Sequence, residues 1–521
     1  MPRASGFSAR LGDRVEGNAA QQPSTPHPLA GGPPFPQAGQ GLRPRHSSAP
    51  PSDCPASGLR SPVCDLADLV ARFSLGWLAA ANLAGLLLAA LLLWPELNDA
   101  LAPLTYGRWM PLHHNAQLYG WCALPLVGLL LRVFLVPGRA ANRHTLVVLA
   151  AWSAALLLGA VSWLGGGASG KLFLDWTGAA RIGFSLALTA LWAVLAHHAF
   201  RRLAGENSFG FRVSSFGSAH AAPAAALRPQ SSVFSLQPSP TLLRFALIAG
   251  LLLVPTMMYF SAGPNLFPPV NPNSGGATGV SLYGSTLGLL LVFAAMPWMV
   301  ALPLQPGARR SRLTWPILIA ALSVFATANH GHGSHHDRDQ IITLGLLFLA
   351  PPLLARDWRR FVWRPEARGW LVAALVWGAL LVADGWITFL PGFSERLKFT
   401  NALVAHSHLA MAGLITSVNM VFLLHLGDSS RVQSALGART PFWLWQLAAA
   451  LHIALLLALG WREGAAPALV LGGGDTTRLF YLVRLLAGAA MTVASLWWLT
   501  ASFRNRTSDL LAGAAANRLG P

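Results

Sequence analysis

Twelve apolar segments separated by polar loops limit what this chain can form more than any other feature. Each approaches the roughly 20 residues that an α-helix needs to cross the hydrocarbon core of a membrane. We expect such helices at about 71–94, 112–136, 145–165, 179–203, 241–261, 280–302, 313–329, 341–356, 369–390, 401–426, 441–461 and 480–502. The seventh and eighth are short, and Pro351-Pro352 interrupts the eighth. The predicted fold class is therefore an all-α membrane protein with about twelve transmembrane helices.

Composition excludes an ordinary cytosolic enzyme. Of the 521 residues, 54% are hydrophobic and 11% are charged, whereas a typical soluble domain carries roughly 25% charged residues. The net charge of +18 would suit a nucleic-acid-binding protein, but such a protein concentrates its basic residues on one face. Here the cations are almost all Arg and lie between the apolar segments. We therefore expect the lipid bilayer as a partner and no nucleic acid.

The chain divides by composition into a membrane domain and polar flanking segments. Residues 1–66 are rich in Pro, Ser and Arg and are expected to be a disordered tail. Residues 67–503 form the predicted twelve-helix domain, within which 204–240 is a polar cytoplasmic insertion loop. Residues 504–521 form a C-terminal tail.

Arginines fix the predicted orientation. They follow the even-numbered helices at Arg139, Arg143, Arg201, Arg202, Arg309, Arg310, Arg312, Arg356, Arg359, Arg360, Arg364 and Arg368, and they follow the last helix at Arg504 and Arg506. Basic loops remain on the cytoplasmic side of a membrane. We expect a multi-pass protein of a bacterial-type inner (cytoplasmic) membrane with both termini cytoplasmic.

Histidines from helices remote in sequence share one predicted depth. A polar ring within a membrane needs a partner or a ligand. With the orientation above, the second, seventh and tenth helices bring imidazoles to the same outer layer, at His113, His114, His330, His332, His406 and His408. We favour shared ligation of cofactors over histidines with purely structural partners. Five further histidines, which we expect in loops or packing surfaces, are His144, His197, His198, His425 and His452.

The spacing of His406 and His408 carries information by itself. At about 100° per residue, positions i and i+2 of a helix point roughly 200° apart. Two such imidazoles cannot hold one metal, but they can serve two cofactors on opposite sides of the helix. Haem iron is commonly held by axial imidazole, and His113 would supply a second ligand on one side. On the neighbouring helix, Asp384 is expected either in a proton path or near a propionate, or as an interfacial residue exposed to solvent.

Three segments resemble subunit I of the haem-copper oxidases. They are 107–113 (GRWMPLH), 399–408 (FTNALVAHSH) and 481–488 (YLVRLLAG). The resemblance covers the twelve-helix region and is closest to the C-family, cbb-type cytochrome c oxidases, with nitric oxide reductase as a related branch. It implies two haem groups of b type. His113 and His408 would be the axial pair of the low-spin haem, and His406 the proximal ligand of the high-spin haem. Arg484 would contact a haem propionate or another polar group inside the bundle.

The sequence departs from this family at the copper site. Residues 283–286 read Tyr-Gly-Ser-Thr, so Ser285 stands where the family has a copper-binding histidine. One histidine, His330, remains of the pair that ends helix seven, and the family's helix-seven tyrosine is missing. A hydroxyl replaces imidazole poorly as a copper ligand, so Tyr283, Ser285 and His330 indicate a degenerate binuclear site. Copper is doubtful, although His330 and His332 leave open a site for copper or another metal.

The resemblance implies electron transfer through the low-spin haem to the high-spin haem, for reduction of oxygen or nitric oxide. No Cys-x-x-Cys-His motif for covalent haem attachment is present, so a cytochrome c-type or other respiratory subunit would deliver electrons. One alternative is a haem relay without catalysis, or a homologue that binds a diatomic gas. Another is a non-redox transporter or scaffold with the same fold, although the two halves lack the repeats typical of transporters.

Overall fold

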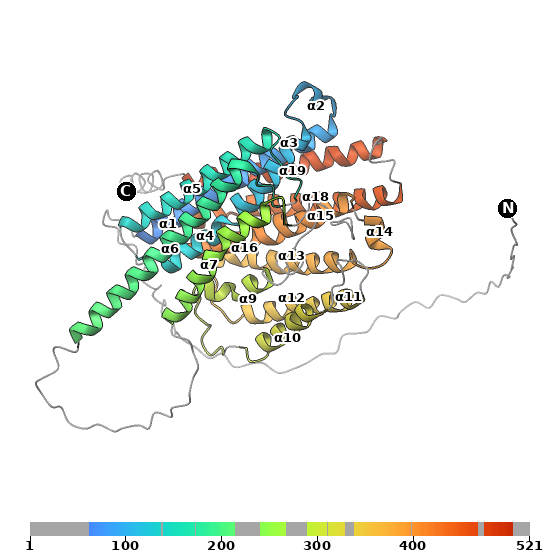
Figure 1. The fold of residues 1–521 in the computed structure, drawn as a ribbon. Helices are drawn as coiled ribbons and strands as arrows, with labels where there is room; N and C mark the ends of the chain where they lie inside the picture. The colour runs from blue at the N-terminus through green and yellow to red at the C-terminus, as the bar shows by residue number, and fades with distance from the viewer. Residues whose placement is uncertain are drawn as a thin grey trace, which may run out of the picture. The chain divides into compact units, whose positions relative to one another are not determined.

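The computed structural model describes residues 62–136, 139–171, 173–213, 240–266, 289–309, 311–328, 338–397, 399–466 and 474–503 (Figure 1). Within these ranges the chain is helical, apart from turns and one isolated bridge between Leu304 and Phe361. Four residues predicted at the binuclear site lie outside the described residues: Tyr283, Ser285, His330 and His332. The predicted C-terminal tail, most of the predicted N-terminal tail and most of the predicted insertion also lie outside them.

The described residues between 62 and 262 form the helices of the first half of the chain. They are α1 (Pro62–Leu93), α2 (Glu96–Ala100), α3 (Tyr106–Asn115), η1 (Ala116–Cys122), α4 (Leu124–Phe134), α5 (Arg139–Leu164), α6 (Gly178–Val213) and α7 (Pro240–Ala262). The predicted second span is thus one continuous rod made of α3, η1 and α4.

The second half begins with short helices and ends with long ones. They are α9 (Leu289–Met299), α10 (Thr314–Thr327), α11 (Arg338–Gly345), η3 (Leu346–Leu349), α12 (Ala350–Trp358), η4 (Pro365–Ala367), α13 (Arg368–Ile387), α14 (Phe393–Leu397), α15 (Asn401–His408), η5 (Leu409–Ile415), α16 (Thr416–Leu426), α17 (Ser430–Leu436), α18 (Arg439–Ala465) and α19 (Asp475–Phe503). The predicted eighth span is divided at η3 because Pro351 and Pro352 begin α12, and proline cannot donate the backbone hydrogen bonds that would continue α11.

Ten helical segments of the described chain are long and apolar enough to cross a membrane. Two further predicted spans correspond to shorter apolar helices, α9 and α10. The prediction of an all-α, multi-pass membrane protein is therefore confirmed, whereas the count of twelve spans stays a prediction.

Two helices extend beyond the predicted spans. Helix α1 begins at Pro62, ahead of the predicted start at residue 71, and α6 continues to Val213, into the segment expected to be a loop. At 1.5 Å per residue, the 36 residues of α6 measure about 54 Å, well over the ~30 Å of hydrocarbon. The apolar pattern marks only the part of a helix within the lipid, so the polar extension was not predicted.

The spans that carry the paired histidines each contain a π-helical segment that begins one or two residues after the second histidine. These are η1, which follows His113 and His114, and η5, which follows His408. Each contains a glycine under a tryptophan: a Cβ on Gly120 would lie 2.6 Å from Cβ of Trp77, and one on Gly413 would lie 2.7 Å from Trp377. π-helical turns occur frequently at functional sites.

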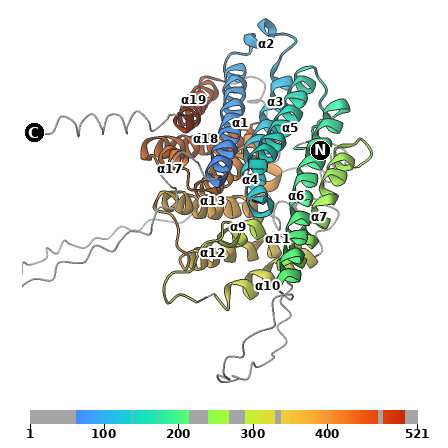
Figure 2. The same cartoon turned by 90° about the vertical axis from the view of Figure 1, so that its left-hand side faces the viewer.

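The tenth span lies at the centre of the bundle. Every residue of α16 is buried. Helix α15 packs on α18 (Figure 1), α18 packs on α19, and α19 packs on α1 (Figures 1 and 2). Hydrogen bonds join the second and tenth spans, because the Trp121 indole donates to Thr416 Oγ1 at 2.9 Å and the Asn419 amide donates to the Trp121 carbonyl at 3.0 Å. Both spans carry histidines, and these buried bonds fix the position of one span along the other.

Candidate functional site: two cavities on either side of α15

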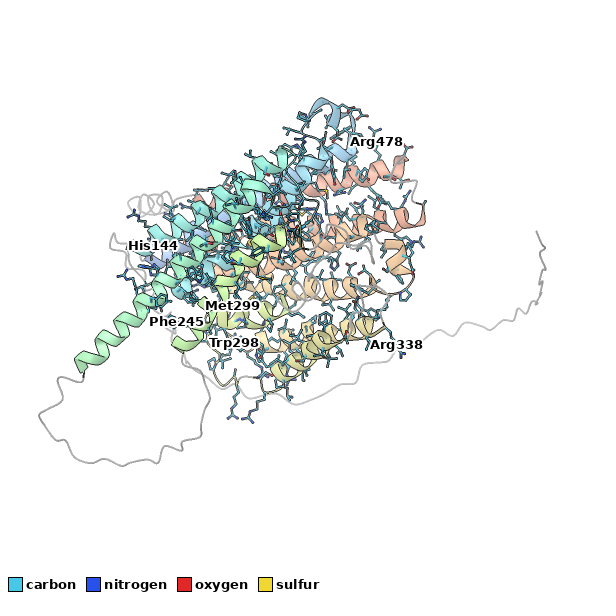
Figure 3. All side chains as sticks on the ribbon, viewed as in Figure 1. His144, Phe245, Trp298, Met299, Arg338 and Arg478 are labelled. Carbon is cyan, nitrogen blue, oxygen red and sulfur yellow. The ribbon has the colours of Figure 1, made fainter. Side chains whose placement is uncertain are left out.

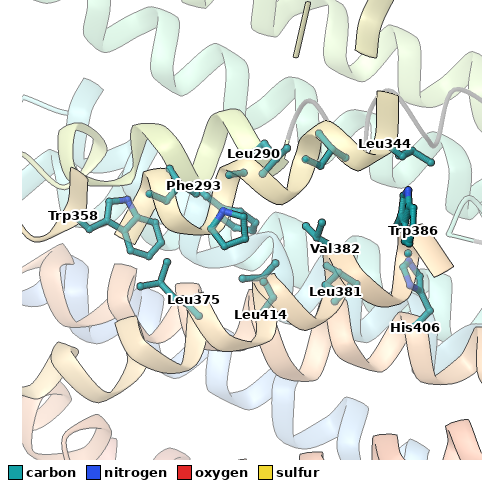
Figure 4. Close-up of a pocket in the computed structure, with 18 of the residues that line it drawn as sticks. Leu290, Phe293, Leu344, Trp358, Leu375, Leu381, Val382, Trp386, His406 and Leu414 are labelled. Atoms are coloured by element: carbon teal, nitrogen blue, oxygen red, sulfur yellow. The ribbon is translucent and has the colours of Figure 1, made fainter. Parts of the chain in front are cut away.

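Helix α15 separates two cavities. The first, here called the polar cavity, measures about 310 Å³ and lies among α1, α3, α15, α18 and α19; its lining includes Asn82, His113, His114, Gln117, His408, His452 and Arg484. The second, called the apolar cavity, measures about 210 Å³ and lies among α9, α12, α13 and α15; its lining includes His406 among aliphatic and aromatic side chains (Figure 4). His406 and His408 thus line different cavities on opposite sides of one helix.

His113 is held in the polar cavity by its contacts with α1. Its Nδ1–H donates to the Ala81 carbonyl at 2.8 Å, which leaves Nε2 with a free lone pair. The ring lies directly against Gly85, where a Cβ would come within 2.6 Å of the His113 Cε1 atom. Glycine is therefore required at position 85 if the imidazole is to keep this place.

His408 shows the same arrangement. Its Nδ1–H donates to the Val404 carbonyl one turn earlier at 2.8 Å, so its Nε2 is also left as an acceptor. Histidines that bind metals typically donate the other ring N–H to a carbonyl or carboxylate, which fixes both tautomer and orientation. Both histidines that we predicted as an axial pair therefore line one cavity in a form suited to ligation.

His452 is a member of this cavity that the sequence analysis placed in a packing surface. Its ring centroid lies 4.7 Å from that of His408. The side chain is buried, and its ring nitrogens lack a hydrogen bond of normal length and angle among the described residues, with the Arg484 backbone as the nearby hydrogen-bonding group. The signal available in the sequence was a histidine in the middle of an apolar span, which we interpreted as packing.

Several polar atoms around the polar cavity are buried without a hydrogen-bond partner in the described part of the chain. Besides the nitrogens of His452, they are Asn82 Nδ2, Gln117 Oε1 and Arg484 Nε. A buried polar group without a partner costs roughly 1–3 kcal/mol, so a cluster of them around one cavity indicates a polar ligand. A haem fits this donor set, because iron would engage the imidazoles and a propionate would engage the guanidinium.

A buried carboxylate helps to position residues at the polar cavity. Glu463 of α18 accepts hydrogen bonds from the backbone and side-chain amides of Asn401, at 2.8 and 2.6 Å. Asn401 Oδ1 in turn accepts from Arg484 Nη1 at 3.4 Å. Glu463 therefore anchors the first turn of α15 and, through Asn401, helps orient Arg484. Glu463 was not predicted from the sequence, because its role depends on the packing of two distant spans.

The apolar cavity contains a single imidazole with a carboxylate partner. His406 Nδ1–H donates to Asp384 Oδ2 at 2.8 Å, which leaves its Nε2 free. In Figure 4, His406 and Trp386 lie at one end of the cavity and Trp358 at the other. Asp384, expected in a proton path or exposed at the interface, is thus a mostly buried partner of His406.

A loop beside α7 closes one side of the polar cavity. Phe173 lines the cavity, and its carbonyl accepts a hydrogen bond from the Tyr119 hydroxyl at 2.5 Å. The Lys171 ammonium donates to the Ser261 carbonyl in the last turn of α7 at 3.0 Å and to the Leu266 carbonyl just past the helix at 2.6 Å. Burial lowers the pKa of Lys171, and burial raises the pKa of Asp175 against the opposing effect of its hydrogen bonds from Ser169.

The described residues contain no group of three or more His, Cys, Asp or Glu side chains placed to hold a metal ion. The predicted copper ligands His330 and His332 lie outside this part of the chain, so the copper prediction stays open. No protein-family model matches the sequence, and no curated protein is significantly similar to it.

Proposed function

We propose that the protein is a membrane-bound haem redox subunit related to subunit I of the haem-copper oxidases. A low-spin haem of b type would occupy the polar cavity and a high-spin haem the apolar cavity. The observation that carries this proposal is that one helix separates two cavities and contributes His408 to one and His406 to the other.

The residues of the polar cavity have separate roles in holding such a group. His113 and His408 would bind the iron through Nε2, since each Nδ1–H is already donated to a carbonyl. Arg484 would pair with a propionate, which gives its buried Nε a partner. The iron would supply a one-electron couple, and the hydrogen bonds from His113 and His408 to backbone carbonyls would keep the two imidazoles in place during a change of charge.

The apolar cavity would hold its haem through a single imidazole, because His406 is the one histidine in its lining. His406 would hold the iron from one side, and the Asp384 carboxylate that accepts its Nδ1–H makes the imidazole a stronger electron donor. Oxygen or nitric oxide reduction is the reaction that we propose, with the conventional copper site lost. Electrons would come from a cytochrome c-type or other respiratory subunit, and the orientation would keep both termini cytoplasmic in a bacterial-type inner membrane.

A haem relay or gas-binding protein without turnover is the second candidate. It is favoured by the lining of the apolar cavity, which offers a diatomic gas one imidazole and otherwise mostly apolar side chains. In that case the high-spin haem would bind the gas but would not reduce it.

The reduced-minus-oxidised spectrum and metal content of the purified protein test the proposal. We expect haem b bands, about two irons per chain and no stoichiometric copper. Uptake of oxygen or nitric oxide with a chemical reductant would select catalysis, whereas gas binding without uptake would select the second candidate. A protein without any haem band would contradict both and favour a transporter or scaffold.

A further inference from the structure

Three imidazoles meet at the end of the bundle where α5 begins and the membrane-spanning part of α6 ends. The ring centroids of His144 and His198 lie 5.1 Å apart, and His197 lies 5.8 Å from His144 and 5.4 Å from His198. We call these residues the imidazole triad. Figure 3 shows His144 at the end of the bundle opposite to Arg338 and Arg478.

The hydrogen bonds of the imidazole triad run in one direction. The backbone N–H of Val136 donates to His198 Nδ1 at 3.1 Å, so this nitrogen is unprotonated and the ring is neutral. The proton of His198 therefore resides on Nε2, which donates to His144 Nδ1 at 2.8 Å. A neutral His144 then carries its proton on Nε2. The chain of bonds ends on a half-exposed ring with an N–H left to donate.

Cationic side chains surround this donor. Arg143 and Arg201 lie near enough to His144 to act on it electrostatically, and Arg201 and Arg202 act on His198 in the same way. The charged or titratable groups that act on these two rings are all histidines or arginines. Arg202 donates to the Leu135 carbonyl at 2.8 Å, whereas neither Arg143 nor Arg201 forms an ion pair with a described carboxylate. The site therefore combines a fixed N–H donor with positive charge.

Apolar surface continues from the cationic site along the same helices. Val147, one turn beyond Arg143 in α5, is 50% exposed, and Phe200 is 58% exposed beside Arg201. The spans delimited by length and hydropathy begin at Ala140 and end at Arg202. The charged groups thus lie near the ends of these spans, where lipid headgroups are expected, and the exposed apolar groups lie on the spans themselves.

We propose that Arg143, His144 and Arg201 bind the phosphate headgroup of an anionic phospholipid. Arginine guanidinium groups match phosphate geometry and form strong charge-assisted hydrogen bonds with it, and the His144 N–H adds a directed donor. The adjoining apolar surface selects a lipid over free inorganic phosphate. This inference does not depend on the presence of haem.

The test is lipid retention by the purified protein, measured by native mass spectrometry with added phosphatidylglycerol or phosphatidylcholine. The variant R143Q/R201Q should retain phosphatidylglycerol at least tenfold more weakly than the unmodified protein, because it loses two charge-assisted contacts. The variant R143K/R201K keeps the charge and should retain most of the binding. R356Q/R359Q, which removes two exposed arginines elsewhere, is the matched control and should bind normally.

Three results would overturn the proposal. Equal retention of phosphatidylglycerol and phosphatidylcholine would show that headgroup charge is not recognised. Equal weakening in R143Q/R201Q and in the control would show that only net charge matters. Displacement of the lipid by millimolar inorganic phosphate would show that the site binds a free anion. Thermal unfolding of each variant confirms that the protein compared is folded.

Discussion

The polar and apolar cavities share helix α15 but differ in the number of histidines that line them and in the hydrogen bonds of their polar atoms. The polar cavity is lined by four histidines and by polar atoms without partners. The apolar cavity has one histidine, and that histidine is already paired with a carboxylate. A cavity with several free donors suits a ligand held from both sides and at its periphery. A cavity with one imidazole suits a ligand held from a single side, with room left opposite it.

The largest effect is expected from replacing the histidine of one cavity, because only the haem of that cavity should be lost. His408→Ala should remove the low-spin haem and leave the high-spin haem, because only the polar cavity loses a ligand. His406→Ala should do the reverse. Iron content and the reduced spectrum of each variant measure this, with His197→Ala as a control far from both cavities. Loss of both haems in either single variant would contradict the assignment of one histidine to each cavity.

Two glycines offer a second comparison of the cavities. Gly85→Ala would place a methyl group 2.6 Å from the His113 ring, so we expect a displaced imidazole, loss of most of the low-spin signal and about 1–3 kcal/mol of destabilisation. Gly385→Ala would place one 3.3 Å from the His406 ring and should cost less than about 1 kcal/mol. Thermal unfolding and haem spectra test the pair. Equal effects would show that His113 is not confined as the structure indicates.

A smaller effect should follow removal of the charge behind the polar cavity. Glu463→Gln loses one of two acceptors for Asn401 and a buried negative charge linked to Arg484. We expect destabilisation of about 1–3 kcal/mol and a higher midpoint potential for the low-spin haem only. Glu395→Gln, at an exposed position of the short helix α14, is the control. A shift confined to the high-spin haem would place Glu463 with the wrong cavity.

The smallest effect concerns the apolar cavity. Asp384→Asn keeps the shape of the side chain but weakens its acceptance of the His406 N–H. The imidazole then donates less charge to iron, so the midpoint potential of the high-spin haem should rise modestly while the low-spin haem is unchanged. Redox titration followed by visible spectroscopy measures both. An unchanged high-spin haem would mean that this hydrogen bond does not tune the site.

The sequence predicted those features that depend on local periodicity. Apolar segments of membrane length predicted the helices, and the angle between positions i and i+2 predicted that His406 and His408 would face opposite sides. His452 and Glu463 were missed, because their roles come from contacts between spans that are distant in the chain. The π-helical segments were not predicted either, and the close approach of Gly120 and Gly413 to tryptophans of other helices is likewise a contact between distant parts of the chain. The copper-site prediction at Ser285 and His330 stays a prediction.

Electron paramagnetic resonance of the oxidised protein tests the central claim most directly. The account predicts two ferric signals in equal amounts, one low-spin signal typical of two imidazole ligands and one high-spin signal from a five-coordinate haem. A single low-spin signal that accounts for all the iron, or a protein without ferric haem, would contradict the assignment of one cofactor to each side of α15.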